Sequence, residues 1–275
     1  VIYDVFIPLY DAVVNDRKLI KEGTIASRML HRFEALCCRS ADLCLLDTKA
    51  HCKYIRKEFK LPPQRVRHVY LGSTIQSNFH KPAMPENKTF RVLYTGTYIP
   101  LHGVKTIVSA AKILIDNPEV QFIFIGQGQL KHEIKDLVKD MNLNNIEFID
   151  WVSTDRLGET IRNHHLSLGI FGTTAKAFRV IPSKVYDICA AGVPFVTADT
   201  PAIQEIFAHK KNAYLIPADD PTALANAILV LKNNPILMRK IASAALDTGK
   251  TLFSLDYIGR QVLDILNNAG QSNIS

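Results

Sequence analysis

The sequence has no apolar run close to the roughly 18 to 20 residues that a membrane-spanning helix needs, and no charged-then-apolar leader opens it. It also lacks a C-x-x-C pair and has an odd number of cysteines, so neither a disulfide framework nor a zinc site is indicated. Reduced core thiols are the simpler interpretation, which favours a cytoplasmic protein or one bound peripherally at the inner face of a membrane. The five cysteines are Cys37, Cys38, Cys44, Cys52 and Cys189.

The sequence also lacks a basic run interleaved with aromatic residues, because its Lys and Arg residues are scattered along the chain. Its net charge is nevertheless +7, which favours an anionic partner. Nucleic acid is disfavoured by the scattering. Phosphorylated small molecules and an acidic membrane surface remain as partners.

The chain of 275 residues opens without an initiator Met on an apolar run, Val1–Phe6, which predicts a buried strand with no preceding cap or tail. We therefore expect a fragment of a longer protein. The first part then predicts a helix around Ala26–Arg39, a strand at Leu43–Asp47, a helix from Thr48 and a strand at Val66–Tyr70. This order is typical of the closing units of an α/β domain.

From Phe90 onward, short apolar runs rich in β-branched and aromatic residues alternate with segments of helical period. This alternation predicts a doubly wound parallel sheet wrapped by helices. The helices should begin near Gly103, Gly128, Ser153, Ser183, Pro201, Pro221 and Pro235. The predicted strands are Phe90–Thr95, Val120–Ile125, Ile146–Ile149, Leu166–Phe171, Pro194–Ala198 and Ala213–Ile216.

Between these two parts, Leu71–Lys88 is polar and rich in turn residues, as an interdomain linker should be. At the other end, Ser254–Asn267 carries an apolar stripe at helical spacing and predicts a last amphipathic helix. The stripe consists of Leu255, Ile258, Val262, Ile265 and Leu266.

The first segment with chemical potential is the turn after the first strand of the second part. Gly96 lets backbone N–H groups approach an anion closely, and the helix that follows adds favourable partial charge at its N-terminus. Thr97 belongs to the same turn, and His102 is placed to donate to a phosphate or a sugar hydroxyl. A purely structural turn with a surface histidine is the competing interpretation.

The second segment is a G-x-G turn at Gly126 and Gln127, which also follows a strand. It lacks the third Gly of the dinucleotide fingerprint, which disfavours NAD. Trp151 and Val152 come just past the third strand and should lie at the same carboxyl edge of the sheet, where a base or ribose would bind. Plain packing is the competing interpretation of Trp151.

The third segment enters a helix at Pro182. Ser183 is predicted to cap this helix, Lys184 lies in its first turn, and Asp187 follows three residues later on the same side. The pair suits a nucleotide diphosphate, with the lysine on the phosphates and the carboxylate on two ribose hydroxyls. A salt bridge within the helix without any ligand is the alternative.

This third segment resembles the C-terminal domain of glycosyltransferase family 4, whose members are retaining enzymes with two Rossmann-like domains, the GT-B fold. The turn at Gly96 to Gly103 is similar to a family variant, and Val1 to Gly72 resembles the end of the family's N-terminal domain. The residues that match the family pattern in order are Pro182, Lys184, Asp187, Gly192, Pro194, Thr200, Pro201 and Glu205.

Two departures stand out. The family commonly has two Glu residues eight positions apart. Asp187 keeps the second carboxylate, but Arg179 stands at the first position, which puts in doubt any sugar contact made there. The usual Arg and Lys pair after the first strand is also absent, with Tyr98 and His102 in that neighbourhood. We expect Arg179 or Lys184 to supply the missing charge.

The resemblance implies an α/β protein of GT-B type in four parts: a remnant of the N-terminal acceptor-side domain (1–75), a linker (76–88), a nucleotide-sugar domain (89–252), and a C-terminal helix (253–275) that packs back on the N-terminal part. It implies a hexosyltransferase that moves a sugar from a nucleotide diphosphate to a glycan or lipid-linked acceptor with retention, as in polysaccharide or cell-envelope biosynthesis. Whether this fragment is active by itself is left open.

The same resemblance assigns catalytic roles to Lys184, Asp187 and Arg179. It assigns donor binding to the two glycine turns and to the residues just past the third strand of the second part. Neither a metal nor another cofactor is expected. Two alternatives remain: a non-catalytic sugar-nucleotide-binding or assembly subunit, and an epimerase of similar architecture, which would need cleft carboxylates that the sequence does not place. The predicted donor-binding residues are Gly96, Thr97, His102, Gly126, Gln127, Trp151, Val152 and Ser183.

Overall fold

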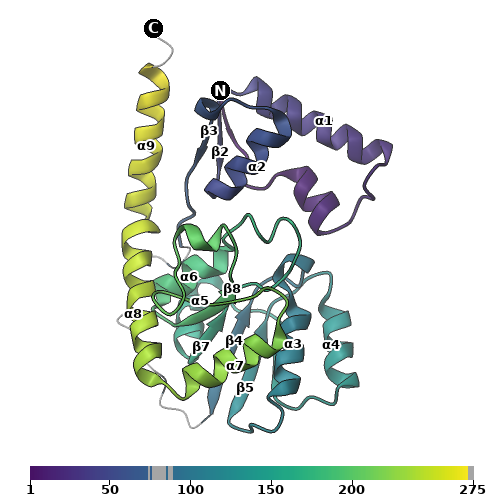
Figure 1. Cartoon of the computed structure of the whole chain (residues 1–275), viewed down its shortest axis with the longest axis vertical. Coiled ribbons are helices and arrows are strands. Elements are labelled where there is room, and N and C mark those ends of the chain that lie inside the picture. The colour runs from purple at the N-terminus through teal and green to yellow at the C-terminus, as the bar shows by residue number, and fades with distance from the viewer. Residues whose placement is uncertain (74, 76–84, 86–88, 272–275) are drawn as a thin grey trace.

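The computed structural model describes residues 1–73, 75, 85 and 89–271. Within this part of the chain, two parallel sheets form two units that lie one above the other in Figure 1. The predicted linker at 76–88 lies outside the described residues except for Pro85. No helix in the described ranges is long and apolar enough to span a bilayer.

The larger unit contains a sheet of six parallel strands in the order β6-β5-β4-β7-β8-β9. The strand order therefore reverses between β4 and β7, as in dinucleotide-binding α/β folds. The predicted doubly wound sheet is confirmed, with all six strands where the apolar runs place them. Their bounds are β4 (Phe90–Thr95), β5 (Val120–Ile125), β6 (Ile146–Ile149), β7 (Leu166–Leu168), β8 (Phe195–Ala198) and β9 (Tyr214–Ile216).

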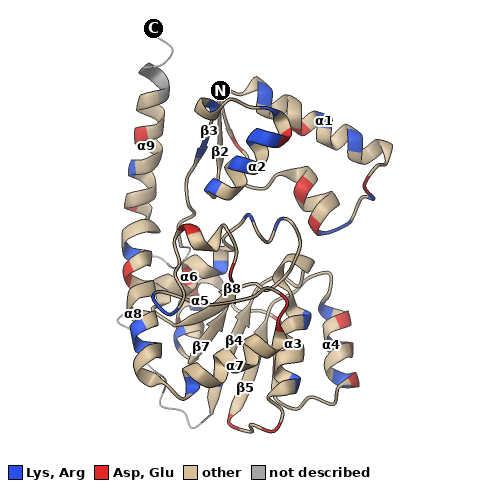
Figure 2. Ribbon diagram, viewed as in Figure 1, with Lys and Arg blue, Asp and Glu red and all other residues tan. Residues whose placement is uncertain are grey.

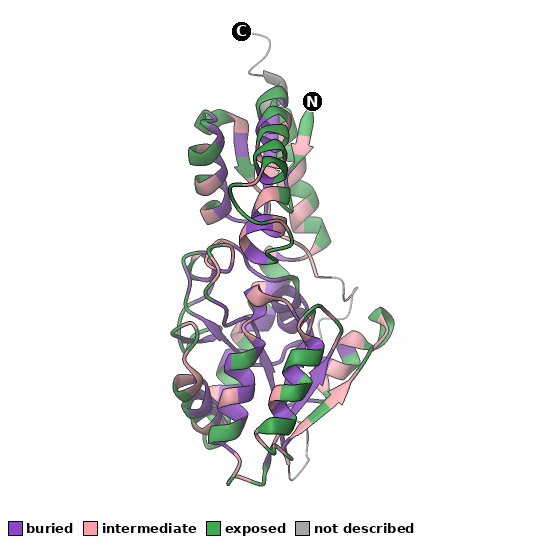
Figure 3. Ribbon diagram, turned by 90° about the vertical axis from the view of Figure 1, so that its right-hand side faces the viewer, coloured by how far each residue is buried: buried purple, intermediate pink, exposed green. Residues whose placement is uncertain are grey.

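Alternate side chains of the central strands enter two separate cores. Val92 and Tyr94 pack with α3, α4 and α7 on one face, and Leu93 packs with α5 and α6 on the other. Burial on both faces explains why these strands are apolar throughout, and Figure 3 shows the buried residues gathered around the sheet. The helices are α3 (Val104–Ile113), α4 (Lys131–Asp140), α5 (Thr154–Arg162), α6 (Ser183–Ala191), α7 (Pro221–Lys232) and α8 (Pro235–Leu252).

The smaller unit has a parallel sheet in the order β1-β2-β3 and two main helices. Thr24 and Thr48 cap these helices by accepting hydrogen bonds from backbone N–H groups. The prediction of a buried first strand was wrong, because Ile2 is 46% exposed on a strand that pairs only with β2 among the described residues. The bounds are β1 (Ile2–Asp4), α1 (Ile25–Ser40), β2 (Leu43–Leu46), α2 (Lys49–Phe59) and β3 (Val66–His68).

Other local predictions also needed correction. The expected helix near Pro201 is only a 3-10 turn, η4 (Ile203–Glu205), because the Asn212 side chain binds the backbone of Ile206 and Ala208 and ends it. β7 is shorter than predicted, because the Thr197 hydroxyl contacts the backbone of Ile170. A π-helix, η1 (Asp11–Asp16), was not predicted at all.

The expected last helix is present as α9 (Leu255–Gln271), which runs alongside the smaller unit in Figure 1. Its Ile258 and Val262 line a cavity of about 310 Å³ together with Phe6 and Leu45 of the smaller unit. Ile258 also packs on the core cluster that contains Tyr70. The division into parts at 1–75, 76–88, 89–252 and 253–275, with the last helix packed back on the N-terminal part, remains a prediction.

Candidate functional site

The carboxyl ends of β4 and β7 define the candidate site, because ligands of open α/β sheets bind where the strand order reverses. The two chain segments beyond these strands touch closely. A Cβ on Gly103 would lie 2.4 Å from the backbone nitrogen of Gly172, and its three nearest atoms would all be main-chain atoms of Phe171 and Gly172. Only glycine permits this approach, which brings the turn after β4 against the loop after β7.

The turn after β4 also rests on the turn after β5. The backbone N–H of Gly96 donates to Ile125 at 3.0 Å. Gly126 has φ +139°, and a Cβ on it would lie 2.0 Å from the carbonyl oxygen of Gly96. The two predicted glycine turns are therefore stacked at one edge of the sheet.

Thr97 and Gln127 continue these two turns side by side. The Tyr98 N–H donates to the carbonyl of Gln127 at 3.0 Å, which joins them. The carbonyl of Thr97 accepts from the hydroxyl of Tyr94 at 3.0 Å. These hydrogen bonds hold the backbone of the two turns in place.

His102 lies beside this turn and is buried rather than on the surface. Its Nδ1 is 2.8 Å from the Tyr94 hydroxyl, and its backbone carbonyl accepts from the Phe171 N–H. Burial, followed by the nearby charge of Lys184, lowers the pKa of His102 well below the ordinary histidine value. The imidazole is therefore neutral at physiological pH and offers a hydrogen bond without a charge.

Lys184 is the cation that the fold places under the first turn. It is 7% exposed, and its Nζ lies 4.0 Å from the centre of the Tyr94 ring. A Cβ on Gly96 would lie 2.9 Å from this nitrogen, which shows that the ammonium group reaches the turn. Among the described residues, its Nζ donates one long hydrogen bond of 3.4 Å, to the carbonyl of Gly169. Burial lowers the pKa of Lys184 well below 10.5.

Ser183 does not cap α6 as predicted. Pro182 occupies the N-cap in an extended conformation, and no side chain caps the helix. Ser183 is instead the first helical residue, because the extended segment ends at Pro182, with ψ 144°, and a residue with helical backbone cannot act as the N-cap. The first-turn N–H groups of α6 are consequently not satisfied by a side-chain cap.

Asp187 is buried one turn further along α6. Its Oδ1 accepts from the Ser73 hydroxyl at 2.8 Å. Ser73 in turn donates its backbone N–H to Phe253 at the end of α8. The carboxylate that was predicted to bind the ribose therefore already accepts a hydrogen bond from Ser73, in the segment that leaves the smaller unit.

Past the end of β6, Trp151 is 74% exposed, so the interpretation of this side chain as plain packing was wrong. It follows Asp150 directly, two residues past the end of β6. Lys131 lies nearby, donates to Gly126 at 2.7 Å, and pairs with Asp150, whose pKa it lowers. Val152 is half-buried against the core beside α5 and α6.

Arg179 is not among the groups around Lys184. Its Nη2 donates to Asp11 at 2.5 Å, and its guanidinium carbon lies 3.9 Å from the centre of the Tyr54 ring. The Thr48 hydroxyl also donates to the Arg179 carbonyl. These three partners belong to the smaller unit, so Arg179 joins the two units.

Sequence reasoning missed most of the groups at this junction. Asp11 is fully buried on the π-helix, and its Oδ2 lies 4.0 Å from Nε2 of His51, which pairs through Nδ1 with Asp47 at 2.7 Å. The run of Asp11–Asp16 gave no motif that would have indicated this arrangement. The buried Asp47 and His51, four residues apart at a helix start, were the one available signal.

Glu205 provides a second link between the units. Its carboxylate accepts from the backbone N–H groups of Lys49 at 2.9 Å and Ala50 at 2.7 Å, and from the Tyr70 hydroxyl at 3.0 Å. The positive end of α2 thereby receives a negative charge from the larger unit. The sequence pattern included Glu205 without suggesting this role.

No group of three or more His, Cys, Asp or Glu side chains is arranged to hold a metal ion within the described part of the chain. The five cysteines are free. The expectation that catalysis needs no metal remains a prediction.

Solved structures identify the class of this fold. HepE from Anabaena, in complex with UDP and glucose, has a TM-score of 0.78, 17% identity, and coverage of 97% of this chain and 71% of its own. Sucrose-phosphate synthase from Thermosynechococcus elongatus has a TM-score of 0.79 and 16% identity, with coverage of 98% of this chain and 68% of its own. The chain has an α/β fold of GT-B type.

The family follows from the sequence itself. Residues 76–248 match the family described as "Glycosyl transferases group 1", and the chain belongs to it. The chitobiosyldiphosphodolichol beta-mannosyltransferase of Candida albicans is 25% identical over 240 residues, which are 80% of this chain and 52% of that protein. The phosphatidyl-myo-inositol mannosyltransferase of Mycobacterium leprae is 23% identical over 188 residues, 66% of this chain and 47% of that protein. The chain spans about half the length of these curated relatives.

Proposed function

We propose that this chain is the donor-binding part of a retaining glycosyltransferase of family 4, of hexosyltransferase type, which takes its sugar from a nucleotide diphosphate. The observation that carries the proposal is the gathering of Gly96, His102 and Lys184 at the strand-order reversal, next to the start of α6. This whole arrangement lies within the region that matches the glycosyltransferase family.

The chemistry of that arrangement suits a departing diphosphate. Negative charge develops on the phosphates as the sugar bond breaks, and fixed N–H groups and cations stabilise it. The uncapped start of α6 and the ammonium group of Lys184 offer such groups. The turn at Gly96 and Thr97 lets a phosphate approach the backbone closely, while the Gly96 N–H itself is bonded to Ile125. In this proposal the Tyr94 hydroxyl directs its one proton to Nδ1 of His102 instead of to the Thr97 carbonyl, so the neutral imidazole carries an Nε2–H that donates to a phosphate or sugar oxygen.

The remaining donor contacts follow from positions around the same edge. Asp187 would accept from the ribose, exchanging its bond with Ser73 for one with the ligand. Trp151, exposed past β6, would provide a face for the base, with Val152 and the turn at Gly126 and Gln127 beside it. Each of these assignments is a proposal about this chain.

A glycan or a lipid-linked molecule is the proposed acceptor. The name of the relative from Candida albicans describes a dolichol diphosphate substrate, and a relative from Erwinia amylovora is described as an amylovoran biosynthesis glycosyltransferase. Those names apply to the relatives, and they support polysaccharide or lipid-linked glycan synthesis as the setting for this chain. Contact with an acidic membrane and the absence of nucleic acid as a partner remain part of the proposal.

One observation favours the alternative of a donor-binding subunit without catalysis. Arg179 stands where the family commonly has its first Glu, and its guanidinium is held by Asp11 and Tyr54 rather than directed to a sugar. Transfer assays with the full-length protein separate the two functions.

The test has two stages. A thermal-shift screen of nucleotide sugars identifies the donor, because binding to the folded state raises the melting temperature. Transfer by the full-length protein is then followed by NMR of the anomeric proton. A product of inverted configuration would contradict retention, and binding without transfer or hydrolysis would favour the subunit alternative.

A further inference from the structure

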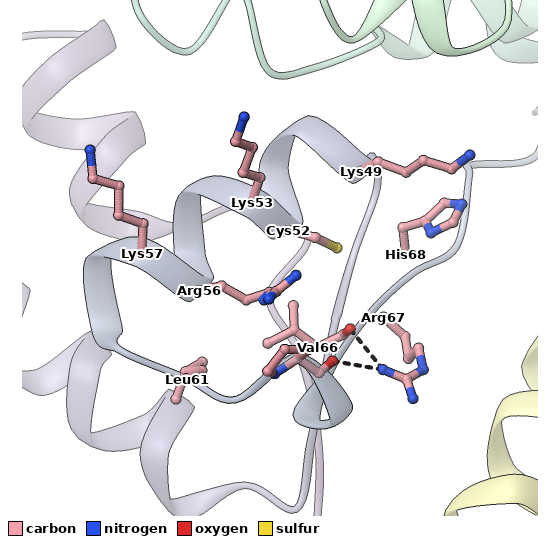
Figure 4. A pocket seen from close by; sticks show the side chains of 10 residues that line it. Lys49, Cys52, Lys53, Arg56, Lys57, Leu61, Val66, Arg67 and His68 are labelled. Atoms are coloured by element: carbon pink, nitrogen blue, oxygen red, sulfur yellow. Dashed lines mark hydrogen bonds between the residues drawn. The ribbon is translucent and has the colours of Figure 1, made fainter.

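A basic groove lies on the smaller unit, between α2 and β3. Figure 4 shows its side chains, and Figure 2 shows the concentration of Lys and Arg along α2. The groove has a volume of about 730 Å³. It is lined by Lys49, Cys52, Lys53, Arg56, Lys57, Leu61, Pro63, Val66, Arg67 and His68.

Five of these ten residues are Lys or Arg, and none is Asp or Glu. The folded chain therefore gathers charge that is scattered in the sequence, because the helical repeat brings Lys49, Lys53 and Lys57 together on one side of α2. None of the five basic side chains forms an ion pair with a carboxylate in the described ranges. Like charges at this spacing repel one another, and a bound anion would remove that repulsion.

The inner wall of the groove contains an arginine with unused hydrogen-bonding capacity. Arg56 extends from the side of α2 that faces β3, and in Figure 4 it lies between Cys52 and Val66. Its Nε is buried and has no hydrogen-bond partner among the described residues. Across the groove, Arg67 is positioned by bonds from Nη1 to the carbonyls of Pro63 at 2.7 Å and Val66 at 3.2 Å. A planar guanidinium that keeps free donors suits a phosphate group.

The rest of the lining restricts the class of ligand. No Phe, Tyr or Trp lines the groove, so it offers no large aromatic face on which a nucleobase would stack. Cys52 lies at the floor, and burial raises the pKa of its thiol to about 12, so it is uncharged. Burial, followed by the charge of Lys49, lowers the pKa of His68, which is therefore a neutral donor at the rim. The groove thus offers cations and neutral donors over an apolar floor.

We propose that this groove binds a phosphate group, carried either by the headgroup of an anionic lipid or by a soluble diphosphate. The site lies entirely on α2, β3 and the segment between them, whereas the proposed donor site lies on the larger unit. The groove proposal and the donor-site proposal can therefore fail independently of each other. Phosphate binding in the groove needs no nucleotide, and donor binding needs none of the groove residues.

The experiment compares two triple variants with the same change in net charge. The groove variant combines Lys53→Gln, Arg56→Gln and Lys57→Gln. The control combines Arg239→Gln, Lys240→Gln and Lys250→Gln, which are exposed positions on α8. A third protein, Lys184→Met, removes the cation of the proposed donor site. Circular dichroism first establishes that each variant is folded.

Two ligands then distinguish the sources of phosphate. Co-sedimentation is measured with phosphatidylcholine vesicles with and without phosphatidylglycerol, and calorimetry is performed with inorganic pyrophosphate. Each cation at a lipid surface strengthens binding about fivefold, so the groove variant should lose at least about tenfold in affinity while the control changes little. Pyrophosphate binding that survives in Lys184→Met and is lost in the groove variant identifies a soluble ligand.

Loss confined to the phosphatidylglycerol vesicles identifies a lipid headgroup. Equal losses in the groove variant and the control would mean that only net charge matters and would overturn the proposal. The proposal is equally overturned if the wild-type protein binds neither ligand, or if pyrophosphate binding depends on Lys184 alone and no vesicle binds.

Discussion

The ammonium nitrogen of Lys184 lies 4.0 Å from the centre of the Tyr94 ring, directly under the turn at Gly96. The aromatic face and one long bond to Gly169 are a weak replacement for water around a buried cation. No carboxylate within the described residues forms an ion pair with it. The position of Lys184 is therefore costly unless an anion binds there.

Replacing this lysine should stabilise the unliganded protein. Folding lowers the pKa of Lys184 below 10.5, so between the two pKa values the unfolded chain holds more protons, and stability falls as pH decreases through that window. Lys184→Met should therefore raise Tm at neutral pH and flatten its pH dependence. Thermal unfolding from pH 6 to pH 9 measures both effects, with exposed Lys139→Met as control. A lower Tm for Lys184→Met alone would indicate a structural lysine.

Asp187→Asn should weaken binding of nucleosides and nucleoside diphosphates by similar factors, since the proposed contact is to the ribose. The expected loss is about 1 kcal/mol or more, the scale of a hydrogen bond to a charged group. Ser73→Ala removes the competing donor and should leave affinity equal or improved. Calorimetry with a nucleoside and with its diphosphate measures both variants. Unchanged affinity in a folded Asp187→Asn variant would contradict the assignment of Asp187 to the ribose.

Gly126→Ala should disrupt the donor edge. The added Cβ would lie 2.0 Å from the Gly96 carbonyl, at a backbone φ of +139° that side chains rarely adopt. We expect a loss of about 1 to 3 kcal/mol in the free energy of unfolding, together with weaker nucleotide binding. Gly259→Ala is the matched control, because its Cβ meets nothing within 4 Å and should stabilise α9 by up to about 1 kcal/mol. Urea denaturation measures the free energy of unfolding of both variants. Equal effects of Gly126→Ala and Gly259→Ala would contradict the role given to Gly126.

Arg179→Gln should destabilise the chain more than a surface change would. It leaves the fully buried Asp11 without its cation, and breaking a buried pair costs about 3 kcal/mol. Asp11→Asn in the same background should recover part of this loss, because both charges are then gone. A double-mutant cycle from urea denaturation measures the coupling, and strictly additive effects would show that the pair does not hold the units together.

The sequence was sufficient for the central strands of the larger sheet, because burial on both faces makes each one an apolar run that periodicity detects. β4, β5 and β6 have the predicted bounds. The sequence was misleading where a single side chain redirects the backbone. The amide of Asn212 ends the expected helix after Pro201, and Pro182 occupies the N-cap position of α6 that Ser183 was expected to fill.

The candidate site divides in the same way. Gly96, His102 and Lys184 were predictable because each follows a strand or opens a helix at one edge of the sheet. The partners of Arg179 were not, because Asp11 is 168 residues away in the chain. Tyr94 was also missed, since an aromatic residue in a buried strand looks the same whether it fills the core or supports a cation.

The most direct test of the account is calorimetric titration of the donor identified by screening, its nucleoside diphosphate and its free nucleoside into wild-type protein and Lys184→Met. The account predicts that the variant loses about 1 to 3 kcal/mol of affinity for both diphosphates and almost none for the nucleoside. It also predicts that the bound anion raises the depressed pKa of Lys184, which would be measured as proton uptake at pH values between the depressed pKa and the ordinary lysine value. Equal affinity of the two proteins for the diphosphates would contradict the proposed donor site.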